Sequence, residues 1–172
     1  MATIDQSRTQ SKTGTGDPPP PPPPNVGLQF NVVVTNASGK IAYELKPTDT
    51  KSGNYLKGPN KQTIDFPNGP DWYDVTFHVV DTDSSQKIVF NTAQPICAKI
   101  GSGCPANGSG INTNNQITVQ DSKEKKLTLQ NCNQEVNSIS YTLFFMDEKT
   151  KQPIDPPYDP VMDNGGGGRG LI

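Results

Sequence analysis

The residue periodicity of this chain is two over most of its length, and this period constrains its fold more than any other feature. The first run places apolar side chains at every second position, Leu28, Phe30, Val32 and Val34, as in a strand with one buried face. A turn sequence follows at 36–39, where Gly39 can adopt a positive φ. Residues 41–45 then alternate again, so the two runs predict a β-hairpin.

Several further segments show the same period, and no segment has a helical stripe. They lie at 62–66, 73–79, 87–91 and 139–145, with a second hairpin expected from 117–119 and 127–129 and a final strand expected to start within 151–154. Short strands with turn signals about every ten residues predict an all-β fold. Two antiparallel sheets must pack face to face, because one sheet alone leaves its apolar face in water. We predict an immunoglobulin-like sandwich, with a jelly roll or a small barrel as the alternative.

Both ends of the chain are typical of disordered or extended tails. Residues 1–25 are polar and then contain seven consecutive prolines, Pro18–Pro24. Proline fixes φ, so this run predicts a polyproline II rod of about 22 Å at about 3.1 Å per residue, suited to a stiff spacer or to a ligand of an aromatic-lined groove. Residues 164–172 contain four consecutive glycines, which indicate flexible coil. One sandwich domain is left at 26–163.

Composition argues against several classes of partner. Fifteen Lys and Arg nearly balance seventeen Asp and Glu, so no nucleic-acid surface is predicted. No apolar run approaches the roughly 18 residues of a membrane-spanning helix. Both arginines, Arg8 and Arg169, lie in the tails, which leaves the domain without the group best suited to anionic substrates. We expect no cofactor and, without a secretory signal, a cytoplasmic protein or one exported by a leaderless route.

The histidine and cysteine positions give little support to catalysis or metal binding. The single histidine, His78, falls on the polar face of the 73–79 strand. Cys97 and Cys104 bracket a six-residue loop that can bring their α-carbons to the roughly 5.5–6 Å of a disulfide. Cys132 is an alternative partner for either, and three reduced thiols are the alternative expected in a cytosol. No metal site is predicted.

A long polar segment at 92–115 and the single tryptophan, Trp72, suggest another kind of function. Long segments without strands in a compact domain are often functional, and Trp72 stands between Asp71 and Tyr73, a setting in which it could stack on a sugar ring. The sequence Asp81-Thr82-Asp83 resembles the start of a calcium loop, but the glycine and glutamate that such a loop needs are missing. We therefore expect its carboxylates in a turn.

Beyond residue 145 the chain is broken by prolines, and among them stands an apolar pair, Val161 and Met162. Asp159 precedes Pro160, and a residue before proline is restricted to extended conformations. The chain should therefore leave its last strand as a straight strap. We expect this strap, Asp159, Pro160, Val161 and Met162, to cover a sheet edge of its own molecule or of a neighbouring copy.

The same C-terminal segment resembles the DP-EP family of small bacterial proteins. The resemblance rests on residues 141–145 as a last strand, on 153–156 and 158–166 with their Asp-Pro pairs, and on the opening strand–turn–strand at 30–45. Bacterial inclusion-body proteins look like more distant relatives. The resemblance implies a bacterial, leaderless, all-β protein that self-assembles, and it implies no activity and no catalytic residues.

These features predict a non-enzymatic structural or interaction protein. Its expected partner is a second copy, in a homo-oligomer or filament, or another protein, and its expected contacts are sheet edges and extended termini, because unpaired edge strands are templates for association. The alternative is a carbohydrate- or surface-binding module that uses the 92–115 loop and Trp72. A hydrolase is least favoured, because His78 would be its only imidazole base.

Overall fold

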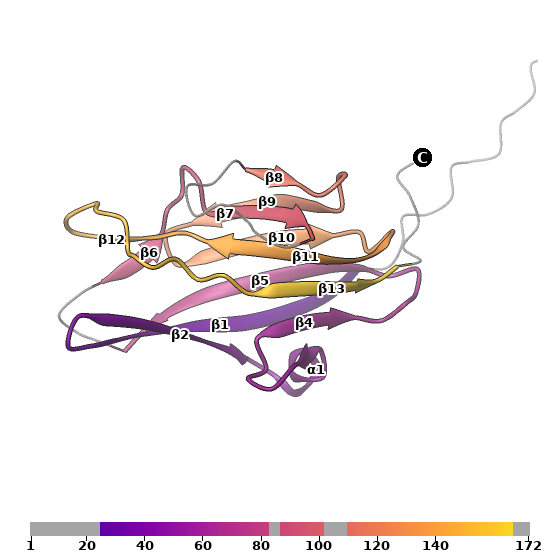
Figure 1. Cartoon of the computed structure of the whole chain (residues 1–172), viewed down its shortest axis with the longest axis horizontal. Helices are drawn as coiled ribbons and strands as arrows, with labels where there is room; N and C mark the ends of the chain where they lie inside the picture. The colour runs from indigo at the N-terminus through magenta and orange to yellow at the C-terminus, as the bar shows by residue number, and fades with distance from the viewer. Residues whose placement is uncertain (1–24, 83–86, 102–109, 167–172) are drawn as a thin grey trace, which may run out of the picture.

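The computed structural model describes residues 25–82, 87–101 and 110–166, and regular structure in these ranges is almost entirely β (Figure 1). Sheet A has the strand order β2-β1-β5-β10-β9, and sheet B has the order β3-β4-β13-β11-β7-β8. The two sheets pack together without closing into a barrel. The predicted two-sheet β-sandwich is therefore confirmed. The heptaproline run, Cys104 and residues 167–172 lie outside the described residues.

Sheet A begins with the predicted hairpin. Its strands are β1 (Asn25–Ala37), β2 (Lys40–Pro47), β5 (Trp72–Asp81), β9 (Ile117–Lys123) and β10 (Lys126–Asn131). The β1–β2 turn has positive φ at Ser38 (55°) and Gly39 (81°), and the Gly39 amide donates to Asn36 Oδ1 at 3.0 Å. The second predicted hairpin is the β9–β10 pair.

Sheet B is assembled from strands distant in sequence. Its strands are β3 (Leu56–Lys57), β4 (Thr63–Phe66), β7 (Ile96–Ile100), β8 (Ile111–Asn112), β11 (Val136–Leu143) and β13 (Val161–Gly165). A ribbon of β6 (Ile88–Phe90) and β12 (Phe145–Asp147) continues one end of the sandwich. The single helical turn in the described ranges is α1 (Thr50–Gly53), where the Ser52 amide donates to Asp49 Oδ1 at 2.6 Å. No helix in the same ranges is long and apolar enough to cross a membrane.

The core lies between the sheets and follows the period-two pattern. In β5 the side chains of Tyr73, Val75, Phe77 and Val79 are buried, while the positions between them are half-buried. The matching positions of β1 face the same core, and the rings of Phe30 and Phe77 lie 6.2 Å apart. Full burial of an aliphatic or phenyl side chain stabilises a fold by about 1.5–3 kcal/mol, so this alternation is what fixes the two layers.

The prediction of purely antiparallel sheets is wrong. Strand β1 pairs with β5 in parallel, and so do β13 with β4 and β7 with β8. After the β1–β2 hairpin the chain crosses to sheet B for β3 and β4 and returns to sheet A as β5, and such a crossover places a later strand parallel to an earlier one. The sheets have five and six strands, more than the four and three of a constant-type immunoglobulin domain.

The sequence pattern also misses four strands of sheet B, which are β3, β7, β8 and β13. The 92–115 segment, predicted to be a loop, contains β7 and β8, with 102–109 outside the described residues. Ile96, Cys97 and Ala98 are all buried, and a strand buried on both faces shows no alternation. The last strand is β13 rather than one within 151–154, so Asn164 and Gly165, assigned to the tail, belong to a sheet, as does Asn25 of the N-terminal tail.

Candidate functional site at the C-terminal strand and the sheet edges

Strand β13 carries the apolar half of the predicted strap and lies inside sheet B. It pairs with β11 in antiparallel, from Ser140 opposite Val161 to Val136 opposite Gly165. On its other side it pairs with β4 in parallel, with Met162 opposite Ile64. The expectation that the strap covers an edge is therefore corrected, because β4 and β3 continue the sheet beyond it. Met162 is buried in the core and Val161 is half-buried.

The residues before β13 are hydrogen-bonded to successive residues of β11. The Asp159 carboxylate accepts a hydrogen bond from Thr142 Oγ1 at 3.0 Å, and the Pro160 carbonyl accepts one from the Tyr141 amide at 3.1 Å. Further along, Ser138 Oγ donates to Asp163 Oδ1 at 2.6 Å. The Asp-Pro pair thus serves to direct the chain into register with β11.

Two tyrosines connect this segment with the β2 edge of sheet A. Tyr158 Oη donates to Gln62 Oε1, and Tyr43 Oη donates to the Pro156 carbonyl at 2.7 Å. The Tyr43 ring stacks between those of Phe145 and Tyr158, with centroids 5.5 and 5.3 Å away. Burial raises the pKa of both hydroxyls above the usual tyrosine range, with a smaller contribution from Asp155 at Tyr43. Both tyrosines therefore act as neutral hydrogen-bond donors.

The end of β13 is held by four buried amide side chains, the amide cluster, comprising Gln116, Asn131, Asn133 and Asn164. Asn131 Nδ2 donates to Asn164 Oδ1 at 2.7 Å, and Asn164 Nδ2 donates to Gln116 Oε1 at 3.0 Å. Asn133 donates from Nδ2 to the Pro67 carbonyl at 2.9 Å and accepts at Oδ1 from the Gly166 amide at 3.1 Å. The cluster joins both sheets at the end where the described chain begins and ends.

Gly165 occupies a position where no side chain fits. A Cβ atom there would lie 2.3 Å from the Asn68 amide nitrogen and 2.5 Å from the Phe66 carbonyl oxygen. Gly166 has a φ of +76°, a conformation that favours glycine. The Asn-Gly-Gly sequence that forms part of the DP-EP resemblance thus has a structural role in this molecule, which is to end the C-terminal strand under the β4–β5 loop.

One side of the sandwich, where β2 and β3 are the edge strands, is closed; we call it the closed side. The inward-facing leucines of these strands, Leu45 and Leu56, are 3% and 6% exposed. The Leu45 amide at the edge of β2 donates to Gln62 Oε1 at 3.3 Å. A side chain thus occupies a backbone donor that another strand would need.

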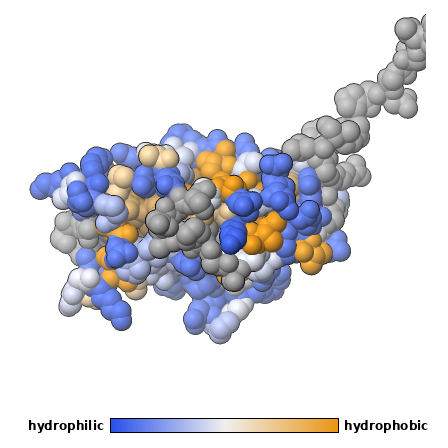
Figure 2. All heavy atoms as spheres, turned by 45° about the horizontal axis from the view of Figure 1, so that its top comes forward, coloured by the Kyte–Doolittle hydropathy of each residue, from blue (hydrophilic) through white to orange (hydrophobic). Residues whose placement is uncertain are grey.

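The opposite side, where β8 and β9 are the edge strands, is different, and we call it the open side. Ile111 pairs with core residue Ala98, and Val119 pairs with core residue Leu129, so both face inward. They are nevertheless 37% and 39% exposed. Figure 2 turns the top of Figure 1, where β8 and β9 lie, toward the viewer, and apolar residues reach the surface there among hydrophilic ones. The apolar core therefore extends to solvent along this side.

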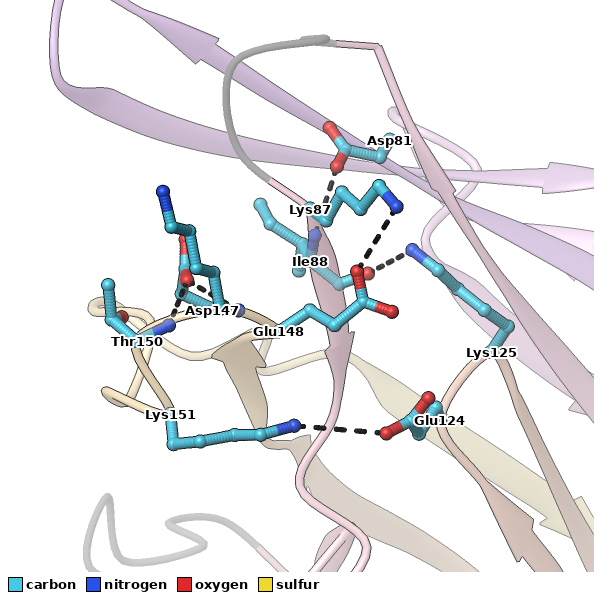
Figure 3. A network of polar contacts seen from close by, with 10 residues as sticks. Asp81, Lys87, Ile88, Glu124, Lys125, Asp147, Glu148, Thr150 and Lys151 are labelled. Atoms are coloured by element: carbon cyan, nitrogen blue, oxygen red, sulfur yellow. Dashed lines mark hydrogen bonds and ion pairs between the residues drawn. The ribbon is translucent and has the colours of Figure 1, made fainter.

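The carboxylates at the far end from the amide cluster are engaged in turns and ion pairs (Figure 3). Asp81 Oδ2 accepts from the Ile88 amide at 2.9 Å, and Asp147 Oδ1 accepts from the Thr150 amide at 2.7 Å. Glu148 lies 3.5 Å from Lys87 Nζ. Asp83 lies outside the described residues, and the described residues contain no cluster of three or more His, Cys, Asp or Glu that could hold a metal ion. These contacts hold the loops at this end together.

Cys97, Cys132 and His78 belong to different parts of the chain's fold, in β7, directly after β10 and in β5. Cys97, in β7, is buried and disulfide-bonded, whereas Cys132 is a buried free thiol whose pKa is raised by burial. Cys104, the partner suggested by sequence, is outside the described residues. His78 is half-buried on the outer face of β5, opposite Lys126 of β10.

The two parts of the predicted carbohydrate site lie in different sheets. Trp72 is half-buried at the start of β5 in sheet A, in phase with Asp74 and Thr76 on the face away from the core. The described part of the 92–115 segment forms β7 and β8 of sheet B. A site on Trp72 would therefore use the outer face of sheet A.

The chain matches no protein-family model and no curated protein in comparisons with known proteins. The resemblance to the DP-EP family stays a prediction without support from them.

The alternation of the strands is enough to predict some residues of the candidate site from the sequence. Asn131 continues the inward phase of Leu127 and Leu129, and Asn164 continues the phase of Met162. An inward polar residue at a strand end indicates a buried hydrogen-bond partner. The exposure of Ile111 and Val119 is not readable, because it depends on which strands end at the edges.

Proposed function

We propose that this protein is a non-enzymatic interaction module that pairs with a second copy of itself through the open side. Strand β9 of one copy would lie antiparallel to β9 of the other and extend sheet A across the pair. The observation that carries this proposal is the contrast between the two sides: Leu45 of β2 and Leu56 of β3 are buried, whereas Ile111 of β8 and Val119 of β9 are more than a third exposed.

The edge of β9 has the properties that strand pairing requires. It is seven residues long, and no described strand pairs with the side turned away from β10. Its N–H and C=O groups on that side are a template for another strand. Covering Ile111 and Val119 would also remove apolar surface from water, which favours association by about 25 cal/mol per Å².

The closed side supports a limited assembly. A filament needs a second, complementary surface on each copy, whereas a twofold pair uses the same surface twice. The β2 edge is occupied at Leu45 by Gln62 and ends at Pro47, and β3 is two residues long. We therefore propose that pairing through the sheet edges stops at a dimer and does not by itself build the filament that the sequence leaves open.

The test is a charge placed on the open edge. We expect Val119→Lys to abolish pairing through β9, because an inward-pointing charge at an edge strand prevents strand pairing. Size-exclusion chromatography with light scattering measures the mass of the full chain and of the variant at matched concentrations.

Val80→Lys is the matched control. Val80 is 36% exposed and Val119 is 39% exposed, but Val80 lies in β5, an interior strand of the same sheet. The proposal requires Val80→Lys to associate as the wild type does and Val119→Lys to associate less than either. Equal masses for the two variants would refute it.

A further inference from the structure

The end of the sandwich that carries the β6–β12 ribbon has a mainly apolar groove of about 310 Å³. This groove is not part of the open side. Its apolar lining consists of two phenylalanines, two prolines and an isoleucine, and its polar lining of Asn91, Gln94 and Asp155: the apolar residues are Phe144, Phe145, Pro153, Ile154 and Pro157. Aromatic and proline side chains with a nearby hydrogen-bond donor are the surface on which polyproline II segments dock.

The base of this groove is held firmly. The Phe145 ring lies against those of Phe90 and Tyr43, with centroids 5.0 and 5.5 Å away. The backbone of Phe144 is fixed on both sides, since its amide donates to the Pro95 carbonyl at 3.0 Å and its carbonyl accepts from the Asn91 amide at 2.9 Å. A groove that is already shaped loses little side-chain freedom on binding.

The Asn91 side chain is held through its oxygen. Asn91 Oδ1 accepts from the backbone amides of Ala93 and Gln94 at 3.2 and 3.4 Å. These two hydrogen bonds direct the Asn91 oxygen toward the backbone turn that follows it. The Nδ2 donor lies on the other side of the amide group. A polyproline segment has carbonyl acceptors and no N–H groups, so a donor beside an apolar wall complements it.

From these observations we infer that the groove binds the heptaproline segment, Pro18–Pro24, of a second copy of this chain. This contact is separate from the open side and does not depend on the proposed β9 pairing.

Length decides that the contact is between copies. The described chain starts at Asn25, opposite Trp72, at the same end as the amide cluster and the start of β11. Phe145 lies nine residues beyond Val136, the first residue of β11, which is about 30 Å along extended chain. The heptaproline segment precedes Asn25 directly in the sequence, and as the polyproline II rod that the sequence predicts it would span only about 22 Å. It therefore cannot lie in the groove of its own molecule.

The test is binding of a fluorescein-labelled peptide of residues 16–26 to the full chain, followed by fluorescence anisotropy. We expect saturable binding that Pro153→Glu weakens about tenfold or more, because a second carboxylate, in addition to Asp155, then stands in place of an apolar wall. Phe144→Ala removes one wall and should weaken binding similarly. Pro70→Glu is the matched control, since Pro70 is another exposed proline and lies outside the groove, and it should bind as the wild type does.

Two further binding measurements distinguish this contact from nonspecific peptide binding and from the β9 pairing. A peptide with all seven prolines replaced by serine should not bind, and equal binding would contradict polyproline recognition. Val119→Lys should bind the proline peptide as tightly as the wild type, whether or not it dimerises. Absence of saturable binding, or equal affinities of the wild type, Pro153→Glu and Phe144→Ala, would overturn the inference.

Discussion

Gly165 shows how one residue fixes the end of the C-terminal strand. Its Cβ position is already occupied by the backbone at Phe66 and Asn68, and neither is the end of a flexible side chain that could move away. The requirement for glycine therefore comes from close approach between two backbones, which a sequence does not display.

We expect Gly165→Ala to reduce the free energy of unfolding by about 1–3 kcal/mol or more, the usual cost of inserting a methyl group into a packed site. Urea unfolding monitored by circular dichroism measures it. Gly27→Ala is the control, because its Cβ would have no heavy atom within 4 Å. Equal stability of the two variants would contradict the close approach.

Asn164 tests the amide cluster in the same way. We expect Asn164→Leu to lose about 1–3 kcal/mol for a buried group left without its partner, here the Asn131 Nδ2 donor, since Gln116 Oε1 still accepts from the Glu135 amide. Leucine has a similar volume, so a loss of this size would report hydrogen bonding. Unchanged urea unfolding would show that the cluster does not stabilise the fold.

Tyrosine ionisation predicts an alkaline limit of stability. Burial, with smaller effects of Tyr55 and Asp71, raises the pKa of Tyr73 from 10.0 to about 12. Below the unfolded-state pKa both folded and unfolded states keep this proton. Above it the unfolded state loses the proton first, so stability should fall as the pH rises toward the folded-state pKa. Tyr73→Phe should make this fall shallower by about one proton, and an unchanged slope in urea titrations at several pH values would contradict the assignment.

Among the elements, β13 has the largest effect on the whole fold, because it joins β11 to β4. Without it, β3 and β4 lose their connection to the rest of sheet B, and Met162 leaves the core. The final described strand is thus an interior element although it comes last in the sequence.

We expect a chain that ends at Asp155 to lose cooperative thermal unfolding, because it lacks β13. A chain that ends at Gly166 keeps every described contact of β13 and should melt as the full chain does. Circular dichroism melting curves compare the three. A cooperative transition of the shorter chain at the wild-type temperature would show that β13 is dispensable.

The predictability of each element follows from its burial. Strands β1, β2 and β5 have one buried face, so their alternation is visible in the sequence. Strand β7 is buried on both faces and shows none. Strand β13 consists mainly of Asp, Asn and Gly in its second half, which are poor strand formers, and it owes its place to pairing on both sides and to the amide cluster. Parallel pairing escapes sequence analysis, because turn signals report only neighbours along the chain.

For the whole molecule, the difference between the two sides decides how copies can meet. On the closed side, Gln62 accepts a hydrogen bond from the edge amide of Leu45, and Leu45 and Leu56 are buried. On the open side, Ile111 and Val119 are exposed to solvent. A bulge at Gln120, where the β9–β10 register shifts, bends the open edge and limits the length of a paired strand. A short paired edge predicts a weak dimer that depends on concentration.

The most direct measurement is the mass of the wild-type chain by light scattering or sedimentation over a wide concentration range. The account predicts that the mass rises from the 18.5 kDa of one chain to at least twice that value. In a variant with Pro18–Pro24 replaced by serine, which removes the second contact, the rise should stop at twice the mass of one chain. A mass that stays at 18.5 kDa at every concentration, or one that grows without limit in the serine variant, would contradict a sandwich that is open on one side alone.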